Sequence, residues 1–260
     1  MCGRYAVFTE EENEELREII NDINERYKQD APKMKTGEIF PTNIVPVITG
    51  HSGSKRAVNL FKWGFPNYRQ PSGVIINARC ETLHEKTTFK KLLACGRCLV
   101  PASGFYEWKA APQHKEKYLI RPTNNELMYF AGLYNNFIDK NGFPFTSFVI
   151  ITTDANIQMS QIHTRMPVIL SKAEAATWIT IGNIENASNS GFVNNSCSFG
   201  NTGITNNVGN TCSTGNSKNT DICANTDSSS IAGRTVISEN TAITSILRPY
   251  SSELIFEKVG

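Results

Sequence analysis

Residues 97–108 read Arg-Cys-Leu-Val-Pro-Ala-Ser-Gly-Phe-Tyr-Glu-Trp, and they combine a strand signal with a chemically useful side chain. The first five residues are mostly apolar and predict a β-strand. Further along, Glu107 places a carboxyl group among aromatic side chains, where it is suited to proton transfer. The simpler interpretation of Glu107 is a buried carboxylate that is paired with an arginine.

Similar segments around this stretch decide the fold class. They are rich in β-branched and aromatic residues and lie at Val74–Ala78, Tyr118–Arg121, Leu127–Phe137, Ser147–Thr152 and Met166–Leu170. Helical pieces between them are few and short, and they do not alternate regularly with the strands. The sequence therefore predicts an α+β fold: a single domain with a curled, largely antiparallel, barrel-like sheet and a few flanking helices.

Two capping boxes predict where helices begin. The first pairs Thr9 with Glu12 and precedes apolar residues at helical spacing, so we expect an amphipathic surface helix after it. The second pairs Ser171 with Glu174 and leads into an alanine-rich run, which predicts a short helix.

The segment from Asn183 to Asn240 differs in composition from the rest of the chain. Asn, Ser, Thr and Gly make up 36 of its 58 residues. Such a segment buries too little apolar surface to offset the entropy lost on ordering. We therefore interpret residues 183–240 as a disordered insertion into one domain, whose main part is 1–182 and whose last segment is 241–260. Insertions of this kind are tolerated because closure entropy grows slowly with loop length.

Charge is segregated along a chain whose formal net charge is only +2. Residues 10–30 carry a net charge of −6 and the insertion carries −2, so the remaining residues carry +10. A body this basic is compatible with a face that binds a polyanion. The chain has no apolar run of about 18 residues, and its N-terminus lacks a secretory signal. We expect an intracellular protein without membrane contact, in the nucleus of a eukaryote or the cytoplasm and nucleoid of a bacterium.

Cys2 is the most reactive candidate among the seven cysteines. Because Cys2 is small, we expect Met1 to be removed, which leaves an α-amine and a thiol on adjacent carbons. Their ordinary pKa values, about 7.7–8.0 and about 8.5, make both groups nucleophiles near neutral pH. A cysteine at this position has no meaning in most chains, so the interpretation needs support from elsewhere. The other cysteines have no metal-site spacing, and we expect neither a metal nor another cofactor.

Four blocks along the chain supply that support. They are residues 1–5 (Met-Cys-Gly-Arg-Tyr), 77–82 (Asn-Ala-Arg-Cys-Glu-Thr), 97–108 and 163–168 (His-Thr-Arg-Met-Pro-Val). In this order they resemble the signature blocks of the SOS response-associated peptidase family, abasic-site sensors that cross-link to DNA. The similarity covers roughly residues 1–182 and 241–260, and four spaced blocks are more specific than one motif. The family lacks the insertion and continues past Tyr250, so we expect the final strand to be missing.

The resemblance implies a reaction and the residues that perform it. The ring-opened abasic sugar presents an aldehyde, which the α-amine of Cys2 attacks to form a Schiff base before the thiol closes a thiazolidine. Glu107 and His163 are implied as acid–base groups, since histidine titrates near neutral pH. Asn77 is implied as an amide that holds the N-terminus or the opened sugar. Peptidase-type hydrolysis and abasic-site lyase activity are further activities that the family implies.

Candidate DNA contacts lie inside or beside the same blocks. Guanidinium groups can bind the phosphates that flank a lesion, aromatic rings can stack on bases, and one short loop matches a family loop near DNA. The candidates are Arg4, Arg79 and Arg165 for phosphates, Trp63, Tyr68 and Trp108 for stacking, and Pro41 and Asn43 in the loop. Arginines are often solvated surface groups, and Trp63 fits a core equally well.

Two other functions fit parts of the sequence. An N-terminal-nucleophile amidotransferase or peptidase also begins with Cys-Gly, but only the first three residues favour it. A non-catalytic single-stranded DNA-binding protein would use the basic body and the aromatic residues, with no role for Cys2. The four blocks favour a monomeric, self-modifying enzyme that cross-links to abasic sites in single-stranded DNA. Replication-fork proteins are compatible partners that the sequence does not identify.

Overall fold

The computed structural model describes residues 2–8, 13–50, 56–70, 73–124, 126–180 and 243–259. The insertion predicted at 183–240 and the capping box of Thr9 and Glu12 lie outside the described residues. The strands are β1 (Arg4–Val7), β2 (Gly37–Ile39), β3 (Ile44–Gly50), β4 (Arg56–Trp63), β5 (Phe65–Pro66), β6 (Val74–Ile75), β7 (Asn77–Arg79), β8 (Arg97–Ala102), β9 (Gly104–Ala110), β10 (Lys115–Pro122), β11 (Met128–Ile138), β12 (Pro144–Asp154), β13 (Arg165–Pro167), β14 (Ile169–Leu170) and β15 (Leu254–Lys258). The α-helices are α1 (Glu14–Arg26), α2 (Thr87–Lys90), α3 (Leu92–Cys95) and α4 (Lys172–Thr180), and the 3-10 turns are η1 (Ala31–Lys33), η2 (Cys80–Thr82) and η3 (Met159–Gln161).

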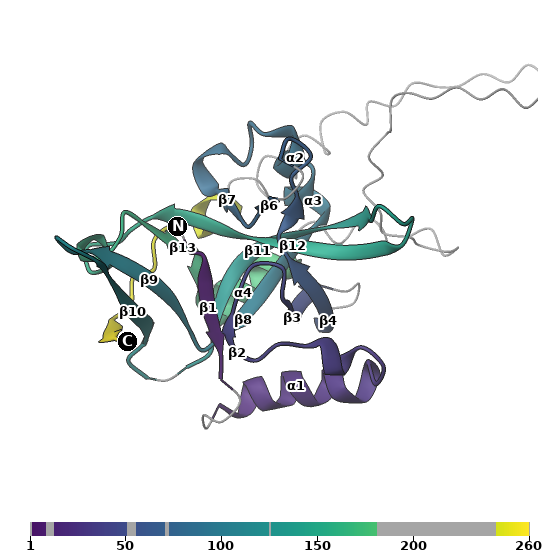
Figure 1. Ribbon diagram of the computed structural model, residues 1–260, viewed down its shortest axis with the longest axis horizontal. Helices are drawn as coiled ribbons and strands as arrows, with labels where there is room; N and C mark the ends of the chain where they lie inside the picture. Colours follow the sequence, from purple (N-terminus) through teal and green to yellow (C-terminus); the bar gives the residue numbers. More distant parts are fainter. Residues whose placement is uncertain are drawn as a thin grey trace, which may run out of the picture.

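Five strands form a closed ring around the core (Figure 1). Their order is β12-β4-β3-β8-β11, and β11 pairs with β12 as well as with β8, which closes the ring. All neighbours in the ring are antiparallel except β12 and β4, which are parallel. The short strands β7, β13 and β14 extend this sheet. The predicted α+β class with a curled, largely antiparallel sheet is confirmed.

A second, antiparallel sheet packs beside the ring and contains the first and the last strands of the described residues. Its order is β15-β10-β9-β1-β2. Strand β15 pairs with β10 from Leu254 opposite Pro122 to Lys258 opposite Tyr118. The expectation that the final strand is missing is therefore wrong: the residues after Tyr250 form an edge strand of this sheet.

The core is built from apolar strand residues that face the inside of the ring. All six residues of β8 are buried, including Leu99 and Val100. Burying each large apolar side chain contributes about 1.5–3 kcal/mol. Trp63 is fully buried here, and its indole Nε1 donates a 3.1 Å hydrogen bond to the carbonyl oxygen of Ile76. Its position corrects the expectation that Trp63 stacks on a base, because its ring has no exposed face.

The helices cover the outside of the ring, and their caps explain where two of them begin. Helix α1 packs against β3 and β4 through a buried apolar face. Its N-cap is Asn13, whose side chain accepts a 3.0 Å bond from Leu16 N–H. The helix predicted after Thr9 and Glu12 is therefore confirmed, and its N-cap is Asn13. The box at Ser171 is confirmed, because each partner accepts a bond from the other's backbone N–H, 2.9 Å to Glu174 and 3.3 Å to Ser171.

Candidate active site

Strands β1 and β9 bring the N-terminus next to Glu107. Arg4 lies opposite Tyr106 in this antiparallel pair, so one step further along the register places Glu107 opposite Gly3. Both Cys2 and Glu107 are buried. Burial, and next the negative charge of Glu107, raise the pKa of the Cys2 thiol far above its ordinary value. The thiol is therefore protonated at neutral pH in this arrangement.

Asn77 connects this N-terminal segment to the closed ring. Strand β7 pairs with β12, and the Asn77 side-chain Nδ2 donates a 2.8 Å hydrogen bond to the carbonyl oxygen of Cys2. The Asn77 side chain therefore links β7 of the ring sheet to the segment that leads into β1 of the second sheet. The other amide atom, Oδ1, is buried and accepts no hydrogen bond from the described residues. A buried acceptor of this kind is suited to a hydroxyl or amine donor supplied by a ligand.

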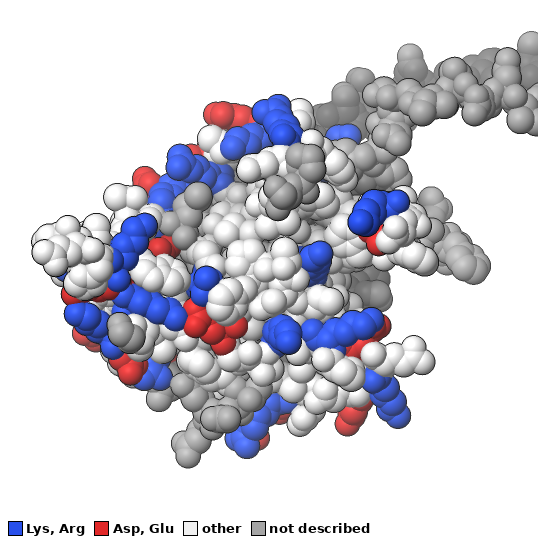
Figure 2. All heavy atoms as spheres, viewed as in Figure 1, with Lys and Arg blue, Asp and Glu red and all other residues white. Residues whose placement is uncertain are grey.

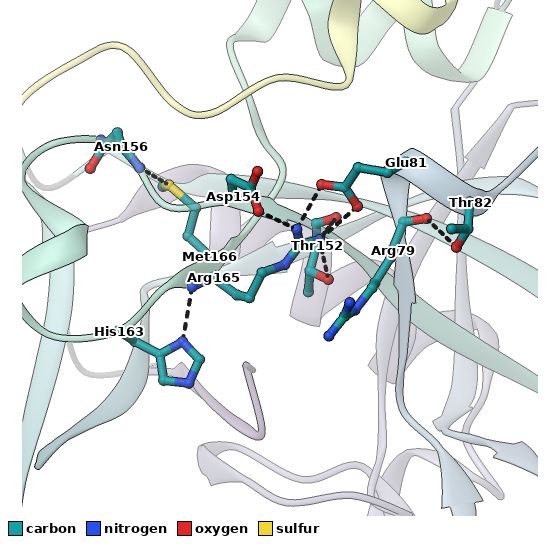
Figure 3. Close-up of polar contacts among 9 residues, drawn as sticks. All are labelled: Arg79, Glu81, Thr82, Thr152, Asp154, Asn156, His163, Arg165 and Met166. Atoms are coloured by element: carbon teal, nitrogen blue, oxygen red, sulfur yellow. Dashed lines mark hydrogen bonds and ion pairs between the residues drawn. The ribbon is translucent and has the colours of Figure 1, made fainter.

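His163 and Arg165 lie on the opposite side of β12 from Asn77. The C-terminal half of β12 pairs with β7 on one edge and with β13 on the other. His163 lies just before β13, and its Nδ1 accepts a 2.9 Å hydrogen bond from the backbone N–H of Arg165 (Figure 3). Strand β12 therefore lies between the block that contains Asn77 and the block that contains His163.

The guanidinium group of Arg165 is occupied by protein groups. Nη1 contacts Glu81 Oε1 and Asp154 Oδ1, each at 2.6 Å. Nη2 contacts Glu81 Oε2 at 3.0 Å and the Thr152 carbonyl oxygen at 2.8 Å. A DNA phosphate would have to displace Glu81 to bind the fork of this arginine. The expected phosphate contact of Arg165 is therefore not met by this arrangement of side chains.

Arg79 has a different environment although it belongs to a neighbouring strand. It is exposed at the end of β7. In Figure 3 its guanidinium points away from Glu81, and no contact is drawn from the guanidinium to the other residues shown. Of the three arginines predicted to bind phosphates, Arg4 and Arg165 are each paired with a glutamate, whereas Arg79 presents its side chain without a competing carboxylate among the residues of that view.

The outer face of the second sheet carries a cluster of aromatic and basic side chains. The guanidinium carbon of Arg4 lies 3.6 Å from the Phe40 ring centroid and 5.7 Å from that of Trp108. The Lys117 ammonium lies 4.3 Å from the Tyr106 ring centroid. We call these residues the aromatic–basic cluster: Arg4, Phe40, Tyr106, Trp108 and Lys117.

One carboxylate holds the two cations of the aromatic–basic cluster. Glu38 accepts a 2.9 Å bond from Arg4 and a 2.8 Å bond from Lys117. These two bonds lower the pKa of Glu38 despite its partial burial, which acts in the opposite direction. The space-filling view shows basic and acidic side chains interspersed over the face that it presents (Figure 2).

The loop between β2 and β3 places Phe40 in the cluster. Asn43 Oδ1 accepts a 2.9 Å bond from the Phe40 N–H, and the Asn43 carbonyl accepts a 2.9 Å bond from Trp63 N–H. Thr42 has a positive φ of 74°, which makes the turn tight. Pro41 and Asn43 thus shape the loop, and Asn43 uses its side-chain oxygen to bind the backbone. Tyr68 is 79% exposed, on the segment that follows β5.

A model of the family described as SOS response associated peptidase (SRAP) matches residues 1–210 of this chain. The chain belongs to the SRAP family. It is 35% identical over 197 residues to the abasic site processing protein YoqW of Bacillus subtilis (strain 168), which covers 71% of this chain and 83% of YoqW. It is 26% identical over 179 residues to the abasic site processing protein YedK of Escherichia coli (strain K12), covering 69% and 79%. The resemblance of the four sequence blocks to this family is therefore confirmed.

Solved structures share the fold of this chain. A crystal structure of a protein from Bacteroides thetaiotaomicron matches with a TM-score of 0.64 and 20% identity, covering all of this chain and 92% of that chain. A second, from Bordetella bronchiseptica, matches with a TM-score of 0.62 and 15% identity over the whole of both chains.

Sequence reasoning missed three residues of this SRAP chain that the structure brings to the aromatic–basic cluster. Phe40, Tyr106 and Lys117 complete the cluster around Arg4 and Trp108. Alternation along β9 is a signal for one of them, since Tyr106 and Trp108 share the face opposite to Glu107. Phe40 stands alone in a proline-rich segment and gives no such signal. Within the described residues, no helix is both long and apolar enough for a membrane span, and no group of three metal-ligating side chains is assembled.

Proposed function

We propose that this protein processes abasic sites in single-stranded DNA by forming a covalent thiazolidine link through Cys2 after removal of Met1. The observation that supports it best is the placement of Cys2 beside Glu107, with its carbonyl held by Asn77 at the junction of two sheets. The relatives YoqW and YedK are named abasic site processing proteins, which supports abasic sites as the substrate.

The chemistry of the aldehyde sets the order of the proposed steps. The α-amine that removal of Met1 exposes attacks first and adds to the C1′ aldehyde of the opened sugar, because only an amine can go on to form an imine. The carbinolamine loses water and becomes an imine. The S–H group then adds across the C=N bond: sulfur bonds to carbon, and the proton goes to nitrogen. The net change is one thiazolidine ring formed and one water released.

Three side chains support these steps in the proposal. Glu107, adjacent to Cys2, accepts and returns protons as the carbinolamine forms and dehydrates. His163 donates a hydrogen bond to the sugar ring oxygen during ring opening. Asn77 holds the Cys2 carbonyl with Nδ2 and offers the buried Oδ1 to a sugar hydroxyl or to the amine. Each group is positioned by a strand, so little reorganisation is needed at the moment of reaction.

DNA reaches this site, in our proposal, over Arg79 and the aromatic–basic cluster. Arg79 binds a phosphate beside the lesion. Phe40, which is 42% exposed, and Trp108 offer faces on which bases stack. Such stacking contributes on the order of 1–3 kcal/mol per base and tolerates any sequence. Tyr68 is exposed enough to extend the stacking surface, as the sequence predicts.

Denaturing electrophoresis tests the proposed function directly. The protein is incubated with a labelled single strand that contains one abasic site, and with the same strand without it. A heat-stable, slowly migrating adduct is expected with the lesion only, and Cys2→Ala is expected to abolish it. Cys80→Ala is the matched control, because Cys80 is a second thiol in a signature block and has no assigned part in the chemistry.

Other results of this experiment, or of a separate assay with glutamine, would favour other functions. Salt-sensitive, reversible binding of both strands without an adduct would indicate a non-catalytic single-stranded DNA-binding protein. Ammonia release from glutamine, lost in Cys2→Ala, would indicate an amidotransferase. An undiminished adduct in Cys2→Ala would end the thiazolidine proposal.

A further inference from the structure

Arg165 connects three elements across one face of the ring. Its strand, β13, pairs with the end of β12, where Asp154 lies opposite Arg165. On the other edge of β12 lies β7, whose Arg79 pairs with Thr152. The Arg165 side chain crosses β12 at Thr152 and reaches Glu81, which follows β7 in the chain (Figure 3).

Glu81 is the carboxylate that the Arg165 guanidinium engages through two hydrogen bonds. Both Glu81 carboxylate oxygens are engaged by the two terminal nitrogens of Arg165, which is the bidentate geometry that guanidinium groups favour. Hydrogen bonds from Arg165 are the main reason that the pKa of Glu81 lies at about 2. Asp154 makes one contact, and its side chain is 79% exposed against 43% for Glu81. Exposed single contacts contribute little, so Glu81 is the main charged partner of Arg165, alongside the buried bond to the Thr152 carbonyl oxygen.

The backbone of Arg165 acts on the histidine. Its N–H donates to Nδ1 of His163 at 2.9 Å. A neutral imidazole has one nitrogen that donates and one that accepts. With Nδ1 held as the acceptor, the proton of His163 lies on Nε2. The tautomer therefore depends on where β13 begins, which is where the Arg165 side chain anchors the strand.

We propose that Glu81 is a positioning residue for His163: it fixes Arg165 at the start of β13, which keeps the Arg165 N–H on Nδ1 and the imidazole proton on Nε2. The inference rests on the proposed function, in which the neutral His163 imidazole donates an Nε2–H hydrogen bond to the ring oxygen as the sugar opens. The ionisable groups around this network are Arg79 of β7, Cys80 and Glu81 of η2, Asp154 of β12 and Arg165 of β13.

The tautomer itself is the first measurement, and it needs no DNA. Spectra of 15N-histidine-labelled protein report whether Nδ1 or Nε2 is protonated, and His163→Ala identifies the His163 signals among the four histidines. The parent and Asp154→Asn are expected to hold the Nε2–H form. Glu81→Gln, which keeps the shape but removes the charge and one acceptor oxygen, is expected to show a mixture of both forms. Asp154→Asn is the matched control because it touches the same guanidinium.

The cross-linking rate is the second measurement. Between about pH 5.5 and 8.5, which spans the ordinary histidine pKa, Glu81→Gln is expected to lose about ten- to a hundredfold in rate and to change the shape of the pH profile. Asp154→Asn is expected to keep the parent profile. Arg165→Lys, which retains the charge but not the fork, repeats the test if Glu81→Gln does not fold.

Two results would overturn the inference. One is an Nδ1–H tautomer in the parent, and the other is an unchanged tautomer in both Glu81→Gln and Arg165→Lys. Failure of the proposed function looks different, since it would remove cross-linking from the parent while leaving the tautomer result unaffected.

Discussion

The guanidinium carbon of Arg4 lies 3.6 Å from the centre of the Phe40 ring, on the outer face of the sheet that also holds the N-terminus. A cation this close to a ring contributes roughly 0.5–1 kcal/mol at an exposed site. The pair keeps the Phe40 ring oriented beside β2, a short strand at the edge of the sheet. A base that stacks on Phe40 therefore meets a surface already in place, next to the first residues of the chain.

Phe40→Ala is expected to weaken non-covalent binding of undamaged single strands by about 1–3 kcal/mol, because one stacking face is lost. Fluorescence anisotropy with a labelled oligonucleotide measures this. Phe143→Ala is the matched control, since Phe143 is a 67% exposed phenylalanine at the tip of the β11–β12 hairpin. Equal losses for both variants would show that Phe40 has no special part in binding.

Glu38→Gln is expected to tighten binding of single strands. Glu38 accepts bonds from both Arg4 and Lys117, so its charge competes with a phosphate for the same two cations. Each further phosphate that the freed cations neutralise steepens the dependence of affinity on salt by about 0.7 on logarithmic axes. Titrations at several salt concentrations check this, and a slope equal to that of the parent contradicts it.

Cys2→Ser is expected to retain the first step and lose the second. The α-amine still forms an imine with the sugar aldehyde, but the hydroxyl closes the ring poorly in comparison with a thiol. The adduct should then survive denaturation only after reduction with borohydride. A stable adduct without reductant would show that the thiol is dispensable.

The protein is expected to lose the stabilisation that ionised Glu81 provides as the solution becomes acidic. Its pKa is lowered from 4.5 to about 2, chiefly by Arg165, so the contribution of the ionised group is fully present above pH 4.5. That contribution falls as the pH drops from 4.5 toward 2. Thermal unfolding of the parent and of Glu81→Gln, followed over this range, should show melting temperatures that converge at the acid end. A constant difference would assign the effect to shape instead of charge.

Local patterns were enough to predict most strands and the fold class, because those depend on alternation and on adjacent residues. The blocks that hold Cys2 and Glu107 were found through their resemblance to a family. The role of Arg165 could not be predicted in this way. Its partners Glu81 and Asp154 lie far apart in the chain, and only the pairing of β7 and β13 with the same strand brings them together. Trp63 illustrates the same limit, since the sequence around an aromatic residue does not show whether its ring lies in the core or on a binding surface.

Strand β15 comes after the composition-biased segment, yet it pairs with β10, which in turn pairs with the strand that carries Glu107. Residues far apart in the sequence therefore build one sheet, and β15 covers the edge of β10 that would otherwise be open. Removing residues 254–258 would expose that edge, one strand away from the strand that carries Glu107.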